Sequence, residues 1–209
     1  KSALQSLKSH YMRQATVARK SKETDIAVSV KLDGTGKVAI KTGIPFLDHM
    51  LTLLGTHGLL DLTVKARGDL EVDLHHTNED IGLVLGQAVD QALGDRKGIT
   101  RFASAYVPMD EALARVVLDI SGRPKLVLRD ARPSARRESR TTAYSWGDVE
   151  HFLESFVRMA KLTVHIDVLA GSDFHHTCEA VFKALGRALE AASRVHHRVK
   201  GVPSSKGRL

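Results

Sequence analysis

The chain has 209 residues, of which 43% are hydrophobic and 26% are charged, and its formal net charge is +7. This composition is typical of a globular protein, and every apolar run is too short for a membrane-spanning helix. The one cysteine, Cys178, excludes an internal disulfide and favours a reducing, cytoplasmic location. The positive charge suits a phosphorylated small molecule better than nucleic acid, because no basic segment interleaves the aromatic residues that would stack on bases.

The N-terminal stretch is basic and carries no regular pattern. Residues 1–18 contain no acidic residue, so we expect a leader or tag with little order. Residues 1–11 are either a tag or a trimmed targeting peptide, and the second origin would indicate a plastid. The elements expected next are a strand from Thr24 to Asp33, a turn at 34–36, a strand over 37–41 that closes a hairpin, a helix from Pro45 to Gly58, strands over 60–66 and 70–74, and a helix over 76–93.

The same succession of elements returns in the second half. Glu111–Gly122 aligns with Glu23–Gly34 without a gap, acid on acid at the start and glycine on glycine at the end. Such a repeat indicates two units that bury their apolar faces against each other. The elements expected here are a strand through Val116 and Leu118, its hairpin partner over 125–129, a basic insertion over 130–144, a helix through 149–157, a strand over 162–168 and a helix from His176.

We therefore predict an α+β protein with an internally duplicated β-β-α-β-α unit. Its two antiparallel sheets would enclose the helices about a pseudo-twofold axis. The halves would span residues 19–97 and 98–209 within one compact domain, because no linker composition separates them.

Each half carries two adjacent histidines and a glutamate at the start of its last helix. His75, His76 and Glu79 recur one hundred positions later as His175, His176 and Glu179. Either motif taken alone is as consistent with an ordinary polar helix start as with a metal site. The duplication favours a metal site, because ligands three or four residues apart share one helical face.

A further histidine precedes the pair in each half, His49 by 26 positions and His151 by 24. Two sets of three histidines and one glutamate predict two metal ions with four protein ligands each. Histidine and carboxylate without thiolate favour Mn²⁺ or Fe²⁺ over Zn²⁺. Cys178 is expected to be a small helical residue, and His57 either caps the first helix or contacts a ligand or the substrate.

Five longer motifs stand out along the chain: Gly43–Met50, His75–Asp80, Ser121–Pro124, His175–Glu179 and Pro203–Gly207. In this order and with these gaps, they resemble one known family, the imidazoleglycerol-phosphate dehydratases of histidine biosynthesis. The resemblance runs from about Arg19 to the C-terminus.

The resemblance implies a hydro-lyase that converts D-erythro-imidazole-glycerol phosphate to imidazole-acetol phosphate and water without a redox cofactor. It implies sites completed between subunits in a shell of twenty-four copies. Two Mn²⁺ would stabilise an imidazolate that expels the neighbouring hydroxyl. One Mn²⁺ would take His49, His76, His175 and Glu179, and the other His75, Glu79, His151 and His176. The catalytic residues would be Glu23, His75 and Glu179, and Glu23 would move the proton. The substrate and phosphate contacts would be Glu23, His49, His57, Arg101, Arg123, Lys183 and, in a C-terminal phosphate-binding tail, Ser204, Ser205 and Lys206.

Two other functions use the same ligand types. A dinuclear hydrolase would form a metal-bound hydroxide, and a non-catalytic assembly protein would use metal only to stabilise subunit contacts. The assembly protein would leave Arg101, Arg123 and Lys206 scattered in space.

Overall fold

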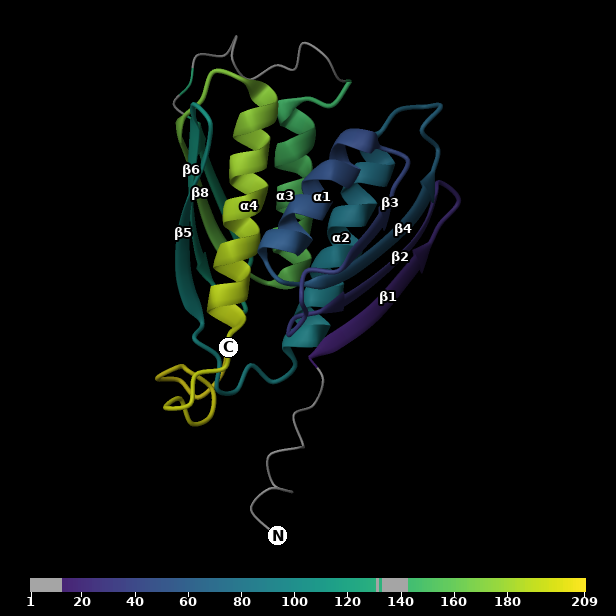
Figure 1. Ribbon diagram of the computed structural model, residues 1–209. Coiled ribbons are helices and arrows are strands. Elements are labelled where there is room, and N and C mark those ends of the chain that lie inside the picture. Colours follow the sequence, from purple (N-terminus) through teal and green to yellow (C-terminus); the bar gives the residue numbers. More distant parts are fainter. Residues whose placement is uncertain (1–12, 131, 133–142) are drawn as a thin grey trace.

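The computed structural model describes residues 13–130, 132 and 143–209 and contains two sheets and four helices (Figure 1). The first sheet holds β1 (Gln14–Lys20), β2 (Thr24–Lys31), β3 (Val38–Lys41) and β4 (Asp61–Gly68). The second holds β5 (Phe102–Met109), β6 (Ala112–Asp119), β7 (Lys125–Asp130) and β8 (Thr163–Ala170). The helices are α1 (Pro45–His57), α2 (His75–Leu93), α3 (Trp146–Ala160) and α4 (Phe174–Ser193).

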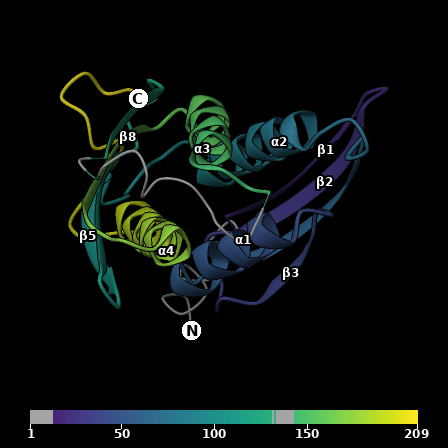
Figure 2. The same ribbon diagram turned by 90° about the horizontal axis from the view of Figure 1, so that it is seen from above.

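The two halves have the same topology, which confirms the predicted duplication. The strand orders are β1-β2-β4-β3 and β5-β6-β8-β7. Seen from above, the helices fill the space between the two sheets (Figure 2). The inward residues of the strands form the core: Val28 faces Val64 across β2 and β4, and Val116 faces Ile166 across β6 and β8, all four fully buried.

The predicted hairpins are wrong, and the sheets are mixed rather than antiparallel. Both edges of β2 are occupied, by β1 on one side and β4 on the other. β3 instead pairs in parallel with β4, and β7 pairs in parallel with β8. The reason lies in the connection: α1 or α3 follows each of these strands, and a helix allows the crossover that a parallel pair needs.

Each half begins with a strand that the sequence pattern did not reveal. β1 starts at Gln14, inside the stretch 1–18 expected to be a leader, and β5 occupies the equivalent place in the second half. Both lie at a sheet edge. The strand expected over 70–74 is absent: the Val72 N–H donates to the Asp69 carbonyl at 2.8 Å and closes a turn. The position of the boundary between the halves stays a prediction.

The helices pack in pairs that join the two halves, α1 with α4 and α2 with α3. Two glycines of α2 permit the close approach of α3. A Cβ on Gly82 would lie 2.8 Å from the Phe152 carbonyl oxygen, and one on Gly86 would lie 2.9 Å from the Ala160 nitrogen.

The basic insertion is described only in part. Asp130, Arg132, Ala143 and Tyr144 belong to the described residues, and the rest of the insertion lies outside them. No helix among the described residues is long and apolar enough to cross a membrane.

Candidate metal and substrate site

The first turns of all four helices meet at one end of the molecule. An aromatic cluster joins them: Phe46 of α1 contacts Phe174 of α4 and Tyr144, with ring centroids 5.4 and 5.3 Å apart. Trp146 of α3 meets Phe174 edge-on at 6.5 Å. The Tyr144 hydroxyl donates to Asn78 of α2 at 2.6 Å. The histidines predicted as metal ligands lie on the first two turns of these helices.

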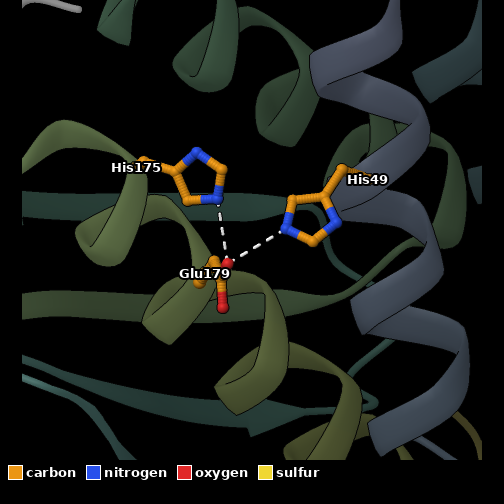
Figure 3. A group of neighbouring side chains, drawn as sticks. All are labelled: His49, His175 and Glu179. Carbon is orange, nitrogen blue, oxygen red and sulfur yellow. Dashed lines mark hydrogen bonds and ion pairs between the residues drawn. The ribbon is translucent and has the colours of Figure 1, made fainter.

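His49, His175 and Glu179 form the first triad (Figure 3). The Nε2 atoms of His49 and His175 lie 3.0 and 2.9 Å from Glu179 Oε1. One ligand atom from each residue falls within a group whose members are all within 4.8 Å of one another. His175 and Glu179 share a face of α4 because they are four residues apart, and α1 brings His49 to that face.

The electrostatic environment keeps the Glu179 carboxylate ionised. Burial opposes this by raising the pKa, but hydrogen bonds from Lys183 and His49 outweigh burial and hold the pKa of Glu179 at about 2. The Lys183 ammonium donates to Glu179 Oε2 at 2.5 Å. Glu179 therefore presents an anionic Oε1 to the two imidazoles.

His75, Glu79 and His151 form the second triad, which is looser: among the described residues, the first triad is the one whose ligand atoms all lie within 4.8 Å of one another. The Nδ1 atoms of His75 and His151 are 3.2 Å apart, and His75 Nε2 lies 4.0 Å from Glu79 Oε2. The other Glu79 oxygen accepts a hydrogen bond from Arg158 at 3.2 Å. Each glutamate thus has a cation on one oxygen and a histidine beside the other.

Each triad draws on both copies of the repeat. The first takes His49 from the first half and two residues from α4, whereas the second takes His151 from the second half and two residues from α2. The cross-repeat helix pairs produce this exchange, because α1 packs on α4 and α3 packs on α2.

His76 and His176 are the two predicted ligands that join neither triad. His76 Nδ1 lies 3.0 Å from Asp69, and His176 Nδ1 lies 2.8 Å from Glu111. These hydrogen bonds raise the pKa of both histidines, and the bond with His176 lowers the pKa of Glu111. The sequence pattern revealed neither acidic partner. The repeat alignment places Glu111 on Glu23, a predicted site residue, and this match could have identified Glu111 as a site residue too.

The donor set fits a divalent metal. Each triad offers two imidazoles and a carboxylate, and no thiol competes, because Cys178 is fully buried in α4. Such ligands suit Mn²⁺, Fe²⁺ or Zn²⁺. In the first triad both ring nitrogens already converge on one carboxylate oxygen, as ligands of a common ion would.

The predicted phosphate contacts gather at the opposite end of the helices. The Arg101 N–H donates to the Ala192 carbonyl at 2.7 Å, at the last turn of α4. Its guanidinium pairs with Asp119 at 2.8 Å and holds the Pro203 carbonyl at 2.8 Å, which fixes the tail containing Ser204, Ser205 and Lys206. About 20 Å of α4 separates this end from Glu179, at 1.5 Å per residue.

The remaining predicted contacts divide between the two ends. Arg123 is exposed on a turn next to the tail: a Cβ on the neighbouring Gly122 would lie 2.6 Å from the Leu209 backbone. Glu23 is exposed and lines a cavity of about 310 Å³ with Asp69, the partner of His76. His57 lines a second cavity of about 560 Å³. Its pKa is lowered, mainly by burial and to a lesser extent by the positive charges of Lys183 and Arg187.

Comparisons with known proteins assign the chain to a family. The family model described as imidazoleglycerol-phosphate dehydratase matches residues 42–189. The chain is 54% identical to the imidazoleglycerol-phosphate dehydratase of Thermoanaerobacter pseudethanolicus over 95% of its own length and 100% of that protein. It is 50% identical to that of Bacillus subtilis, again over 95% of this chain and 100% of the relative.

Solved structures agree with the sequence comparisons. The dehydratase of Staphylococcus aureus superposes with a TM-score of 0.76 at 40% identity, over 88% of this chain and 99% of that one. The dehydratase of Pyrococcus furiosus, in complex with (S)-C348, superposes with a TM-score of 0.77 at 36% identity, over 92% and 100%. The chain belongs to the imidazoleglycerol-phosphate dehydratase family.

Proposed function

We propose that this protein removes water from D-erythro-imidazole-glycerol phosphate to give imidazole-acetol phosphate in histidine biosynthesis. Family membership supports the reaction class. The observation that carries the proposal is the first triad, in which two imidazoles meet one glutamate, together with the looser repeat of the same residue types at His75, Glu79 and His151. A substrate whose imidazole ring has two nitrogens matches two such sites.

Each triad would hold one divalent cation, with Mn²⁺ as the first candidate. His49, His175 and Glu179 would provide three ligands to one ion, and His75, Glu79 and His151 three to the other. Bound cations supply Lewis-acid charge beside the imidazole ring, which a carboxylate alone cannot replace because the hydrogen to be removed is on an unactivated carbon. Lys183 keeps Glu179 ionised, and Lys183 and Arg158 each donate to the glutamate oxygen that does not face the histidines.

The fourth ligands, His76 and His176, would come from neighbouring subunits. Within one chain they pair with Asp69 and Glu111. Each of these bonds uses Nδ1, and an acidic partner on that ring nitrogen is the usual way to orient a ligand histidine. Nε2 would bind the metal, and in His176 this atom lies 3.7 Å from Asp110. We propose that the sites are completed in this way, in an assembly of twenty-four copies.

The phosphate site supports the same assembly. Arg101, Arg123 and the tail lie at the end of the helices opposite the triads, so one chain cannot bring both sets to a small substrate. A second copy would supply Arg101, Arg123, Ser204, Ser205 and Lys206, whose cations and hydroxyls suit a phosphate. Lys183 and His57 would line the substrate path beside the first triad. Glu23 would carry the proton, with His75 and Glu179 as the other catalytic groups.

The direct test is incubation of the Mn²⁺-loaded protein with imidazole-glycerol phosphate while the ketone product is followed. We expect turnover that chelation abolishes and Mn²⁺ restores. The absence of the ketone would overturn the proposed function. Hydrolysis of ester or amide analogues in place of dehydration would identify a dinuclear hydrolase instead.

A further inference from the structure

A buried arginine from the basic insertion reaches the first turn of α4. Arg132 and Asp130 form a fork-to-fork ion pair, with Nε to Oδ1 at 2.9 Å and Nη2 to Oδ2 at 2.7 Å. Both side chains are only 4% exposed. The remaining nitrogen, Nη1, donates to the Thr177 hydroxyl at 2.7 Å. Thr177 lies between His176 and Glu179 in the sequence, so the guanidinium holds the part of α4 that carries these two predicted ligands.

The same guanidinium also contacts α3, which carries His151. Its central carbon lies 4.9 Å from the centroid of the Trp146 ring, within the range of a cation–π contact. Trp146 is the first residue of α3. Arg132 therefore links the start of α4, which carries two residues of the first triad, to the start of α3, which carries one residue of the second triad.

The first half contains a natural comparison. Thr77 is the repeat counterpart of Thr177, and both are fully buried beneath a glycine, Gly68 or Gly171. Thr177 donates to the Asp173 carbonyl at 2.7 Å and accepts from Arg132. Among the described residues, the Thr77 hydroxyl has no hydrogen-bond partner. The packing is thus shared by the two halves, whereas the arginine contact is found on the α4 side.

We propose that Arg132 is a positioning residue that fixes the first turn of α4 through Thr177 and thereby sets the affinity of the first triad for its metal. The inference rests on the proposed function, since it concerns the same metal site. A ligand helix that cannot shift at its first turn keeps His175, His176 and Glu179 in one arrangement. Groups that orient metal ligands change metal affinity by about 10–100-fold when they are removed.

Thr177→Val is the most direct variant, because it removes the hydroxyl and keeps the shape and the Arg132–Asp130 pair. Thr77→Val is its matched control in the other half. Arg132→Lys keeps the charge opposite Asp130 but replaces the fork by a single ammonium, which cannot serve Asp130 and Thr177 with the same geometry. Ile166→Val, in the core of the second sheet, controls for a general loss of stability.

The measurement is Mn²⁺ binding to the full-length protein by isothermal titration calorimetry, with the electron paramagnetic resonance spectrum of the bound ion. We expect Thr177→Val and Arg132→Lys to weaken one class of Mn²⁺ sites by about 10-fold or more and to broaden its spectrum. Thr77→Val and Ile166→Val should bind Mn²⁺ as the unmodified protein does.

Each other outcome counts against the inference. If the unmodified protein binds Mn²⁺ and Thr177→Val and Arg132→Lys bind it equally tightly, the positioning role is wrong while the proposed function stands. An equal loss in Thr77→Val or Ile166→Val would show that the hydroxyl–arginine contact is not the cause. If the unmodified protein binds no Mn²⁺, the proposed function and this inference both end.

Discussion

His49 Nε2 and Glu179 Oε1 lie 3.0 Å apart although 130 positions separate the two residues in the sequence. They come from different copies of the repeat, and His151 meets His75 in the same crossed manner. The two triads therefore share no residue, although among the described residues only the first has its ligand atoms gathered within 4.8 Å of one another. Removing one ligand should therefore disable one triad and leave the protein ligands of the other triad in place.

We expect His49→Ala and His151→Ala each to abolish one class of Mn²⁺ sites and to lower kcat/KM by more than about 100-fold. Loss of a group that only orients a metal ligand costs up to about 100-fold, and loss of the ligand itself should cost more. Calorimetric stoichiometry checks the first result and steady-state kinetics the second. His165→Ala, on β8, is the control and should bind the same amount of Mn²⁺ as the unmodified protein. Loss of both classes in either single variant would contradict the independence of the triads.

Glu23→Gln tests the proposed proton carrier. The substitution keeps the size and polarity of an exposed side chain beside Asp69, so the fold and the Mn²⁺ stoichiometry should not change. We expect kcat to fall by about 100-fold or more, as for the loss of a general acid–base group. Steady-state kinetics at saturating Mn²⁺ measure this effect. Turnover at the unmodified rate with both metals bound would remove Glu23 from the mechanism.

Gly86→Ala tests the contact between α2 and α3. In an open helix this change stabilises by about 1 kcal/mol. Here the new Cβ would lie 2.9 Å from the Ala160 nitrogen and close to the Phe156 carbonyl oxygen, and overpacking of this kind costs about 1–3 kcal/mol. We expect a lower midpoint in urea unfolding. Gly147→Ala is the control, because its nearest neighbour would be the Ser145 hydroxyl at 3.5 Å; an equal loss there would show that packing is not the cause.

Asp61→Asn tests a pH effect far from the triads. The Thr35 and Lys37 N–H groups donate to Asp61 at 2.8 and 3.2 Å, and these bonds lower its pKa below the ordinary 3.8. A lowered pKa in the folded state stabilises the fold above the unfolded-state pKa, and this contribution disappears as the pH falls through the folded-state pKa. The variant should therefore be less stable than the unmodified protein at neutral pH, and the difference in stability should narrow as the pH falls below 3.8, the ordinary pKa of the group. Urea unfolding across this range gives the answer, and a constant difference would contradict it.

Much of the fold could be predicted because central strands and helices have a strong apolar pattern. Val64 alternates with the polar Thr63 and Lys65, and a helix with one buried face follows each set of strands. β1 and β5 escaped detection because edge strands bury few residues: on β1, Val17 is the one residue that is buried. Strand pairing was wrong because periodicity does not identify neighbours. Only the coordinates show that β3 skips β2 and joins β4.

The candidate site divides in the same way. The His-x-x-x-Glu spacing predicted which ligands share a helix face, and the structure places His175 beside Glu179 accordingly. Spacing alone could not reveal that His49 crosses to the other half, because this depends on how α1 packs on α4; the grouping of His49 with His175 and Glu179 was implied only by the resemblance to the family. Nor could it reveal the contact between Arg132 and Thr177, since nothing local distinguishes a buried arginine from the other arginines of the insertion.

The crossed arrangement of the triads has a consequence for how such a protein could arise. A chain of one half alone would carry His49 without its glutamate partner, and could build a triad only by meeting a second molecule of itself. Joining the two halves replaces that encounter by a connection within one polypeptide, which makes the formation of each triad independent of protein concentration. Once joined, the halves were free to diverge, and the buried arginine beneath α4 is one mark of that divergence.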